Sequence, residues 1–379
     1  MTRQGVAAAI DAALFDELIK RFATMFGRDE TPWQAWPLAN APATLGRHDV
    51  VLCDGEATAD AIDRVAAAQA VLIESEREGG RWIDTVRSPM GTWVLDVPAD
   101  GDTAHAPAFV AVLCAALSLH FPAHDALCIA RAWEPGSTAW PSAFARFPRV
   151  RHAALVSPEV PDAAKAAFAP CPPDLGLYAV VPSADWIETL VPLHVPTVQL
   201  RFKSEDAAAV KAEVARAASA AKGSQSRLFI NDHWRVAVDH HAASGGDSGI
   251  YGIHLGQEDL DEADLDAIRA SGLRLGVSTH GYAEMLRVAA IAPSYLALGA
   301  IFPTTTKVMP TQPQGMGRFQ SYVALMKPVI PSLVGIGGVN AGNMREVLAV
   351  GVGSAAVVRA ITEAADVPAA VANLKALFA

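Results

Sequence analysis

The sequence predicts an α/β protein in which a smaller α/β domain precedes a (β/α)8 TIM barrel. From Leu175 onward, eight apolar strand-like segments each lead into a helical pattern, an alternation that is typical of parallel barrels. The length of 379 residues suggests two domains. An apolar content of 51% with only 18% charged residues indicates a large buried core.

The predicted domain boundary lies in a proline-rich stretch between Arg149 and Pro173. Six of the eight tryptophans precede this stretch, so the composition changes across it as well. We expect residues 1–150 to form an α/β domain, residues 151–174 to form a Pro/Ala-rich linker and residues 175–379 to form the barrel.

The first domain is expected to mix helices with short strands. Leu14 and Leu18 belong to an apolar series at helical spacing, which predicts a first helix over Val6–Phe26. The further predicted elements are the strands Asp49–Cys53, Ala70–Ile73 and Thr92–Leu95 and the helices Pro107–Leu119 and Ala123–Trp133.

The second domain is expected to contain eight βα units. Short apolar runs bounded by turn residues predict its strands, and longer amphipathic segments predict its helices. The predicted strands are Leu175–Val181, Thr197–Phe202, Arg227–Asp232, Ile250–Gly256, Arg274–Thr279, Tyr295–Phe302, Leu333–Val339 and Ala355–Ile361. The predicted helices include Asp185–Leu193, Asp206–Ala221, Asp261–Ala270, Asn343–Val350 and Pro368–Phe378.

Charge and cysteine usage narrow the classes of partner. A formal charge of −10 and a pI near 5.5 argue against a nucleic-acid or anionic-membrane surface. The four cysteines lack a C-x-x-C pairing, so we expect reduced thiols in the cytoplasm. The longest apolar helix candidate, residues 106–119, is too short to span a bilayer. We therefore expect small-molecule substrates, and exposed apolar barrel helices leave a homo-oligomer open.

Two carboxylates end neighbouring predicted strands. Asp232 closes the apolar run that begins at Leu228, and Asp259 follows the strand Ile250–Gly256. In a parallel barrel the functional groups gather where strands end, so the two side chains should face one another. Such a pair suits Mg²⁺ that also binds phosphate oxygens.

Long polar side chains mark the second predicted strand. Gln199, Arg201 and Lys203 alternate with Leu200 and Phe202, so the period of two directs all three to one face. A solvated strand edge is the alternative interpretation. Barrel strands are covered by helices on the outside, however, so inward polar groups indicate anion binding.

Three later strand ends carry further polar or glycine-rich loops. Ser278-Thr-His280 ends the fifth predicted strand, and Pro303-Thr-Thr-Thr-Lys307 ends the sixth. Gly335-Ile-Gly-Gly338 follows the seventh strand, where glycines let the backbone approach a ligand closely. These loops are candidates for binding phosphate groups.

Taken in order, these motifs closely resemble thiamine phosphate synthase over Leu175–Ala379. The resemblance implies a (β/α)8 barrel that uses Mg²⁺ in thiamine biosynthesis. It also implies a transferase that joins 4-amino-2-methyl-5-(diphosphooxymethyl)pyrimidine to a thiazole phosphate and releases pyrophosphate. The matching motifs are Gly176-Leu-Tyr, Gln199-Leu-Arg-Phe-Lys203, Phe229-Ile-Asn-Asp232, His254-Leu-Gly-Gln-Glu-Asp259, Gly276-Val-Ser-Thr-His280, Phe302-Pro-Thr-Thr-Thr-Lys307 and Gly335-Ile-Gly-Gly338.

The resemblance also implies residue roles. Asp232 and Asp259 would ligate Mg²⁺, and Arg201, Lys203, Ser278 and Lys307 would be catalytic by neutralising the departing diphosphate. The pyrimidine diphosphate would be held by Gln199, Arg201, Lys203, Asn231, Ser278 and Lys307. The thiazole phosphate would be held by Thr304, Thr306, Gly338, Val358 and Arg359. Arg359 stands where the family usually has Ser.

The first domain resembles the C-terminal half of hydroxymethylpyrimidine phosphate kinases, which are ribokinase-like. The resemblance runs from Val71-Leu-Ile-Glu-Ser through Gly101-Asp-Thr and the helix pair that follows. Those kinases carry a glycine-rich anion hole where this chain has Ala104-His-Ala-Pro107. We therefore expect a degenerate, non-catalytic domain. A bifunctional kinase and synthase, and a non-catalytic barrel that binds thiamine precursors, remain as alternatives.

Overall fold

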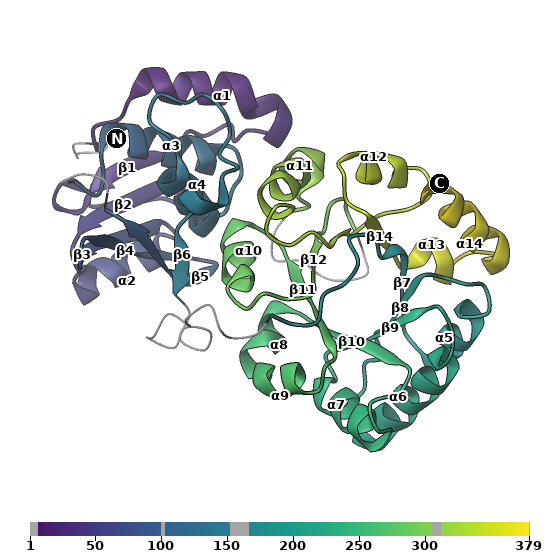
Figure 1. The fold of residues 1–379 in the computed structure, drawn as a ribbon. Coiled ribbons are helices and arrows are strands. Elements are labelled where there is room, and N and C mark those ends of the chain that lie inside the picture. Colours follow the sequence, from purple (N-terminus) through teal and green to yellow (C-terminus); the bar gives the residue numbers. More distant parts are fainter. Residues whose placement is uncertain (1–6, 100–102, 152–166, 305–311, 379) are drawn as a thin grey trace. The chain divides into compact units, whose positions relative to one another are not determined.

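The computed structural model describes residues 7–99, 103–151, 167–304 and 312–378 (Figure 1). Contacts divide the chain into two compact units. The first unit consists of residues 1–160 with 281–287, and the second consists of residues 161–280 with 288–379. The predicted linker, residues 151–174, lies mostly outside the described residues.

The first unit contains a six-stranded sheet in the order β1-β2-β3-β4-β5-β6. The first three strands pair in parallel, and the last three join them as antiparallel neighbours. The strands are β1 (Gln34–Pro37), β2 (Asp49–Asp54), β3 (Val71–Glu78), β4 (Arg81–Ser88), β5 (Gly91–Pro98) and β6 (Arg149–Arg151). The helices are α1 (Ala12–Phe26), α2 (Ala59–Ala67), α3 (Pro107–Ser118) and α4 (Ala123–Ala132), with 3-10 turns η1 (Leu38–Asn40) and η2 (Phe144–Arg146).

The first helix is shorter than the sequence predicted. The Asp11 carboxylate accepts a hydrogen bond from the Leu14 N–H at 3.0 Å, so it caps α1 at Ala12. Residues 7–11 are not helical, and Val6 lies outside the described residues. The prediction of a helix from Val6 was therefore wrong at its start, because a side-chain cap satisfies the first free N–H groups there.

The sequence patterns did not predict strand β4, because a buried charged residue interrupts its alternation of apolar and polar side chains. Along β4 the inward positions are Trp82, Asp84 and Val86. Arg131 of α4 donates to both oxygens of Asp84, at 2.6 and 2.7 Å, and Ser75 of β3 donates to Asp84 at 2.6 Å. The carboxylate is therefore fully paired, although it replaces the apolar residue that would have revealed the strand.

The second unit contains a closed barrel of eight parallel strands in the order β10-β11-β12-β13-β14-β7-β8-β9. Its helices lie outside the ring of strands (Figure 1). The strands are β7 (Gly176–Val181), β8 (Thr197–Leu200), β9 (Arg227–Asn231), β10 (Ile250–Leu255), β11 (Arg274–Thr279), β12 (Tyr295–Leu298), β13 (Leu333–Gly335) and β14 (Ser354–Val357). The helices of this part of the sequence are α5 (Ala184–Leu190), α6 (Ala207–Ala221), α7 (Trp234–Ala243), α8 (Gln257–Glu262), α9 (Leu265–Ala270), α10 (Tyr282–Ala289), α11 (Gly315–Met326), α12 (Met344–Ala349), α13 (Arg359–Thr362) and α14 (Val367–Lys375), followed by the 3-10 turn η3 (Ala376–Phe378). Contacts group residues 281–287, which form most of α10, with the first unit.

The predicted barrel architecture is confirmed, with shorter strands and one divided helix. The sixth and seventh strands end at Leu298 and Gly335, before the loops that the prediction included. The predicted helix Asp261–Ala270 is two helices, because the Asp264 carboxylate accepts from the Ala267 N–H at 2.9 Å and starts α9.

An aromatic layer fills the barrel interior. Tyr178, Phe229 and Tyr295 are fully buried there, with ring centroids 5.2 to 5.9 Å apart. A Cβ atom at Gly252 would collide with the Phe229 ring, and one at Gly276 would collide with the Tyr295 ring. The two glycines therefore leave space for the aromatic layer.

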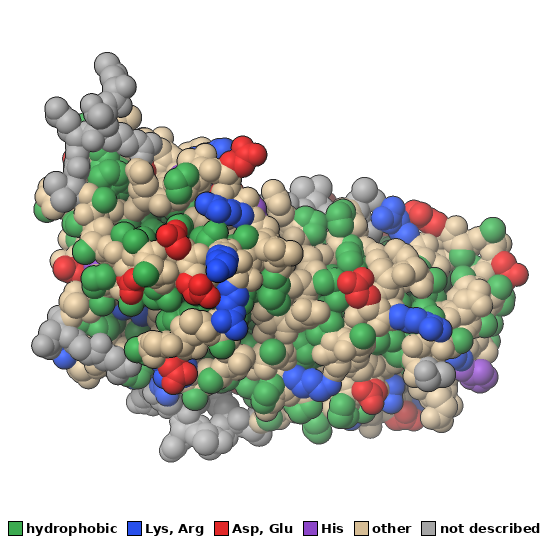
Figure 2. Space-filling view, turned by 90° about the horizontal axis from the view of Figure 1, so that it is seen from above, with side chains coloured by type: hydrophobic (Ala, Val, Ile, Leu, Met, Phe, Trp, Pro, Cys, Tyr) green, Lys and Arg blue, Asp and Glu red, His purple; other side chains and the backbone are tan. Residues whose placement is uncertain are grey.

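The face of the molecule seen in Figure 2 is mixed in charge. In Figure 2 the Lys and Arg side chains lie among Asp and Glu side chains with apolar side chains between them. Within the described ranges no helix combines the length and apolar character needed to cross a membrane.

Candidate active site

The two predicted carboxylates lie at neighbouring ends of β9 and β10. Asn231, the last residue of β9, is in register with His254 of β10, and the Asp232 N–H donates to the His254 carbonyl at 3.0 Å. Asp259 lies in the first turn of α8, directly after β10. Asp232 has a φ of +62°, which few residues other than glycine adopt, so the backbone holds this carboxylate in an unusual direction.

The charges around Asp232 oppose one another. Burial and the nearby Asp259 carboxylate together raise the pKa of Asp232 to about 6, although Arg201 and His233 act to lower it. Asp259 therefore lies close enough to Asp232 to act on its pKa. The pair therefore favours an added positive charge.

Two carboxylates are a small ligand set for a metal ion. Among the described residues, no group of three or more His, Cys, Asp or Glu side chains is placed to hold one. Because Mg²⁺ keeps several waters and takes phosphate oxygens, two carboxylates fit Mg²⁺ when a phosphate ligand supplies the remaining oxygens.

The predicted end of the second barrel strand, at Phe202, was wrong. Strand β8 ends at Leu200, so Arg201 and Lys203 lie in the segment that follows it. Gln199 is buried within β8, and its Nε2 lies 3.5 Å from the Asn231 Oδ1. Arg201 still lies close enough to Asp232 to lower the pKa of that carboxyl, whereas Lys203 is exposed.

Ser278 reaches the same end of the barrel from β11. Its Oγ lies 2.8 Å from the Nε2 of His254, and its carbonyl accepts from the Gln257 side chain at 2.8 Å. The neighbouring Thr279 is buried, with its hydroxyl 3.3 Å from the Ala297 carbonyl. Of these two hydroxyl groups, Ser278 is the one that lies beside the strand ends carrying Asp232 and Asp259.

The remaining predicted residues follow β12, β13 and β14 in the sequence. Thr304 is described, whereas Thr306 and Lys307 lie outside the described residues. Gly338 has a φ of +68°, and a Cβ atom there would lie 2.7 Å from the Cβ of Phe302. Val358 is the residue before α13 and the exposed Arg359 is its first residue.

His254 was assigned no role from the sequence. His254 lies two residues after Gly252, so both residues face the same side of β10. A Cβ atom at Gly252 would meet the buried Phe229 ring, so the His254 side chain points into the barrel. His254 is only 7% exposed, and its ring bridges Ser278 and the Tyr295 hydroxyl, 2.6 Å from Nδ1. The position of a histidine two residues after an inward glycine is the signal that could have identified it.

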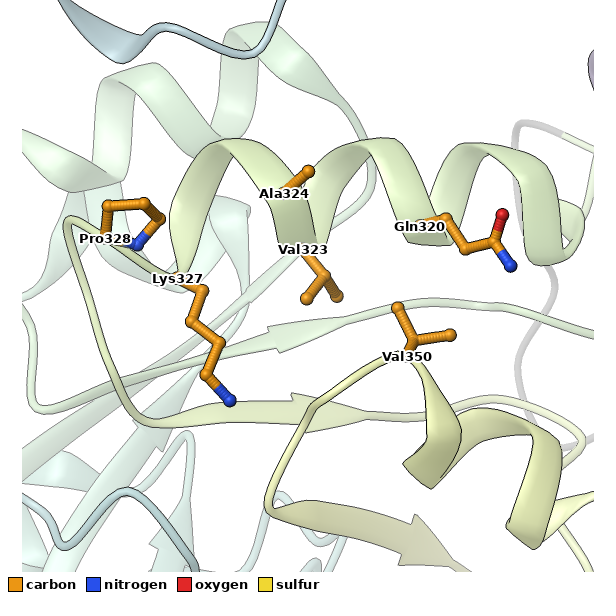
Figure 3. Close-up of a pocket in the computed structure, with 6 residues that line it drawn as sticks. All are labelled: Gln320, Val323, Ala324, Lys327, Pro328 and Val350. Carbon is orange, nitrogen blue, oxygen red and sulfur yellow. The ribbon is translucent and has the colours of Figure 1, made fainter.

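A surface hollow of about 550 Å³ lies elsewhere on the barrel, against α11 (Figure 3). Among the described residues that line it, Lys327 is the charged one, and its ammonium contacts the Gly351 carbonyl. The hollow is away from the strand ends, so it does not belong to the candidate site.

Comparison with known proteins gives one family for the barrel. Residues 177–361 match the family described as thiamine monophosphate synthase. The thiamine-phosphate synthase of Neisseria meningitidis serogroup B is 52% identical over 213 residues, covering 56% of this chain and 98% of the relative. That of Escherichia coli O9:H4 is 49% identical over 207 residues, covering 55% and 93%. A solved thiamine phosphate pyrophosphorylase from Pyrococcus furiosus is 25% identical with a TM-score of 0.45, covering 54% of this chain and 95% of that one.

Proposed function

Because the chain belongs to the thiamine-phosphate synthase family and is a transferase of thiamine biosynthesis, we propose how its barrel performs the reaction. The substrates are 4-amino-2-methyl-5-(diphosphooxymethyl)pyrimidine and a thiazole phosphate, and the products are thiamine phosphate and pyrophosphate. The aminopyrimidine is electron-rich, so the diphosphate departs before the thiazole nitrogen attacks. The task of the site is to stabilise the charge of the leaving group.

The observation that carries the proposal is the pair of carboxylates. Burial, together with repulsion from the Asp259 carboxylate, raises the pKa of Asp232 to about 6. These two side chains would hold Mg²⁺ together with diphosphate oxygens. When bound, Mg²⁺ supplies positive charge next to the departing diphosphate.

The protein groups around this pair bind and orient the pyrimidine diphosphate. Arg201 acts on Asp232 electrostatically, so its guanidinium lies close enough to neutralise diphosphate oxygens there. Gln199 and Asn231 present amide groups at the ends of β8 and β9. Lys203 and Lys307 add ammonium groups, and Ser278 adds a hydroxyl. The reaction needs no protein nucleophile, because the role of these groups is positioning and charge stabilisation.

The thiazole phosphate is held on the opposite side of the barrel opening, by the loops after β12, β13 and β14. The groups are the hydroxyls of Thr304 and Thr306 and the backbone near Gly338 and Val358. The positive φ of Gly338 lets that backbone approach a phosphate without a side chain in between. Arg359 replaces a serine hydroxyl with a guanidinium, which binds phosphate with two hydrogen bonds.

The experiment is the replacement of Asp232 by Asn, with pyrophosphate release as the assay. Loss of one of two metal-binding carboxylates should lower kcat/KM by about 100-fold or more at limiting Mg²⁺. Asp239→Asn on the exposed face of α7 is the matched control and should retain full activity. Undiminished turnover of the Asp232 variant at saturating Mg²⁺ would count against the proposal.

For the first unit we propose a non-catalytic role. The resembling kinases have an anion hole in the segment directly before α3. In this chain His105 lies in that segment. Its Nδ1 lies 3.0 Å from Asp54 and its Nε2 lies 3.0 Å from the Ser75 hydroxyl. Residues 104–107 contain no glycine, so side chains take the space that backbone N–H groups would need around a phosphate. Phosphorylation of hydroxymethylpyrimidine by the full chain with ATP would overturn this proposal.

A further inference from the structure

Four side chains form a continuous hydrogen-bonded chain through the barrel interior, here called the Tyr–His–Ser chain. The Tyr178 and Tyr295 hydroxyls lie 2.7 Å apart, and Tyr295 lies 2.6 Å from the Nδ1 of His254. The Nε2 of His254 lies 2.8 Å from the Ser278 Oγ. The four residues come from β7, β12, β10 and β11, so only the closed barrel brings them together.

The packing around the Tyr–His–Ser chain holds its members in place. Tyr178 and Tyr295 are at most 2% exposed, and His254 is 7% exposed. The Tyr295 ring occupies the place of a Cβ atom at Gly276 and stacks on the His254 ring with centroids 5.7 Å apart. The buried end of the chain is therefore rigid, and Ser278 is its one partly exposed member, at the candidate site.

The number of protons limits the directions in which these hydrogen bonds can run. Burial raises the pKa of Tyr178 and of Tyr295 well above the ordinary value, so each hydroxyl keeps one proton to donate. Among the residues that the structure describes, Tyr295 is the one hydrogen-bond partner of the Tyr178 hydroxyl. A buried donor without an acceptor is costly, so Tyr178 must donate to Tyr295.

This first step determines the others. Tyr295 accepts from Tyr178 and therefore donates to the Nδ1 of His254. A histidine that accepts at Nδ1 carries its proton at Nε2, and that proton is donated to the Ser278 Oγ. The reverse direction would have Ser278 donate to His254, and the last proton, on Tyr178, would then lack an acceptor. A doubly protonated His254 has the same defect and would also place a charge in a buried position.

We propose that the Tyr–His–Ser chain holds His254 in the tautomer with the proton on Nε2 and thereby directs the Ser278 proton toward the ligand. Because the Ser278 oxygen already accepts from His254, its own O–H is turned outward as a donor. Given the proposed function, the acceptor is an oxygen of the diphosphate. His254 and Tyr295 are positioning residues, because they act through Ser278. No proton is transferred between the members of the chain. A hydrogen bond to a charged oxygen is stronger than one between neutral groups.

The tautomer can be tested without any substrate. ¹⁵N-histidine labelling of the full chain, with the signal assigned by its loss in His254→Gln, should show an unprotonated Nδ1 and a protonated Nε2 for this residue. The result does not depend on synthase activity, so it separates this inference from the proposed function. A proton on Nδ1, alone or together with Nε2, would overturn the inference.

Kinetics test the role of Ser278. Tyr295→Phe keeps the ring but removes the donor to Nδ1, so His254 can change tautomer and Ser278 can turn back toward it. We expect kcat for pyrophosphate release to fall at least about tenfold, the effect of one hydrogen bond to a charged group, with the KM for thiazole phosphate unchanged. Tyr322→Phe, at a buried tyrosine of α11 that does not belong to the Tyr–His–Ser chain, should leave kcat unchanged.

A double-mutant cycle separates positioning from mere packing. In a Ser278→Ala background, Tyr295→Phe should cause no further loss of kcat, because the group through which it acts is already absent. If the losses of kcat from the two single substitutions instead multiply in the double variant, Tyr295 acts independently of Ser278, and the proposal is overturned. Unchanged kcat in Ser278→Ala alone would also overturn it.

Discussion

Replacing Asp232 by Asn should make the metal-free protein more stable at pH 8, although the same change removes a carboxylate that we propose is needed for activity. The reason is electrostatic. In the folded chain, burial and the Asp259 carboxylate raise the pKa of Asp232 from its ordinary value of 3.8 to about 6. Above pH 6 the Asp232 carboxyl of the folded state is ionised, although its surroundings favour the protonated form. This ionisation destabilises the folded state.

The magnitude follows from this pKa difference. Each pKa unit corresponds to about 1.4 kcal/mol, so the raised pKa corresponds to about 3 kcal/mol of lost stability at pH 8. Asp232 is partly exposed and is coupled to Asp259, so solvent screening reduces the expected gain from Asn to about 1–2 kcal/mol. For a domain of this size, each kcal/mol shifts the Tm by roughly 2–4 °C.

The sign depends on pH. A carboxyl group with a raised pKa in the folded state stabilises the fold at low pH, and this contribution is lost as pH rises through about 6. Wild type and Asp232→Asn should therefore have similar stabilities near pH 4 and diverge between pH 4 and pH 6. Above pH 6 the difference should stay constant.

The assay is denaturant and thermal unfolding at pH 4 and pH 8 in the presence of a chelator, repeated with Mg²⁺. Added Mg²⁺ should stabilise wild type at pH 8 and have a smaller effect on the Asn variant, because the proposed metal site needs both carboxylates. Equal gains at pH 4 and pH 8, or no gain at pH 8, would refute the reasoning that repulsion and burial at Asp232 destabilise the metal-free fold.

Two further predictions concern packing. Arg131→Met should destabilise the first unit by about 3–5 kcal/mol in urea unfolding, since it leaves the fully buried Asp84 without its counter-charge, whereas Arg149→Met at an exposed position should have little effect. Gly276→Ala should lower the Tm by forcing the Tyr295 ring aside, at a cost of about 1–3 kcal/mol. A Tm equal to that of wild type would show that the ring has room to move.

The order of elements in the barrel followed from local patterns. Short apolar runs with polar ends indicated eight strands, and the structure closes eight parallel strands into a barrel. Asp232 and Asp259 were placed together for a similar reason, because parallel strands that are consecutive in the chain end at the same edge. The strand limits were less accurate, because a polar residue such as Arg201 continues the alternation of a strand that has already ended.

The amino-acid sequence by itself determined the fold class and the residues at the strand ends, since periodicity and turn residues are local properties. Only the tertiary structure decided which side chains meet across the barrel. Tyr295 meets His254 from 41 positions away, and Asp84 is tolerated inside a sheet because Arg131, 47 positions away, is buried beside it. Such contacts depend on barrel closure and helix docking, which bring distant residues within hydrogen-bonding distance and which no local pattern encodes.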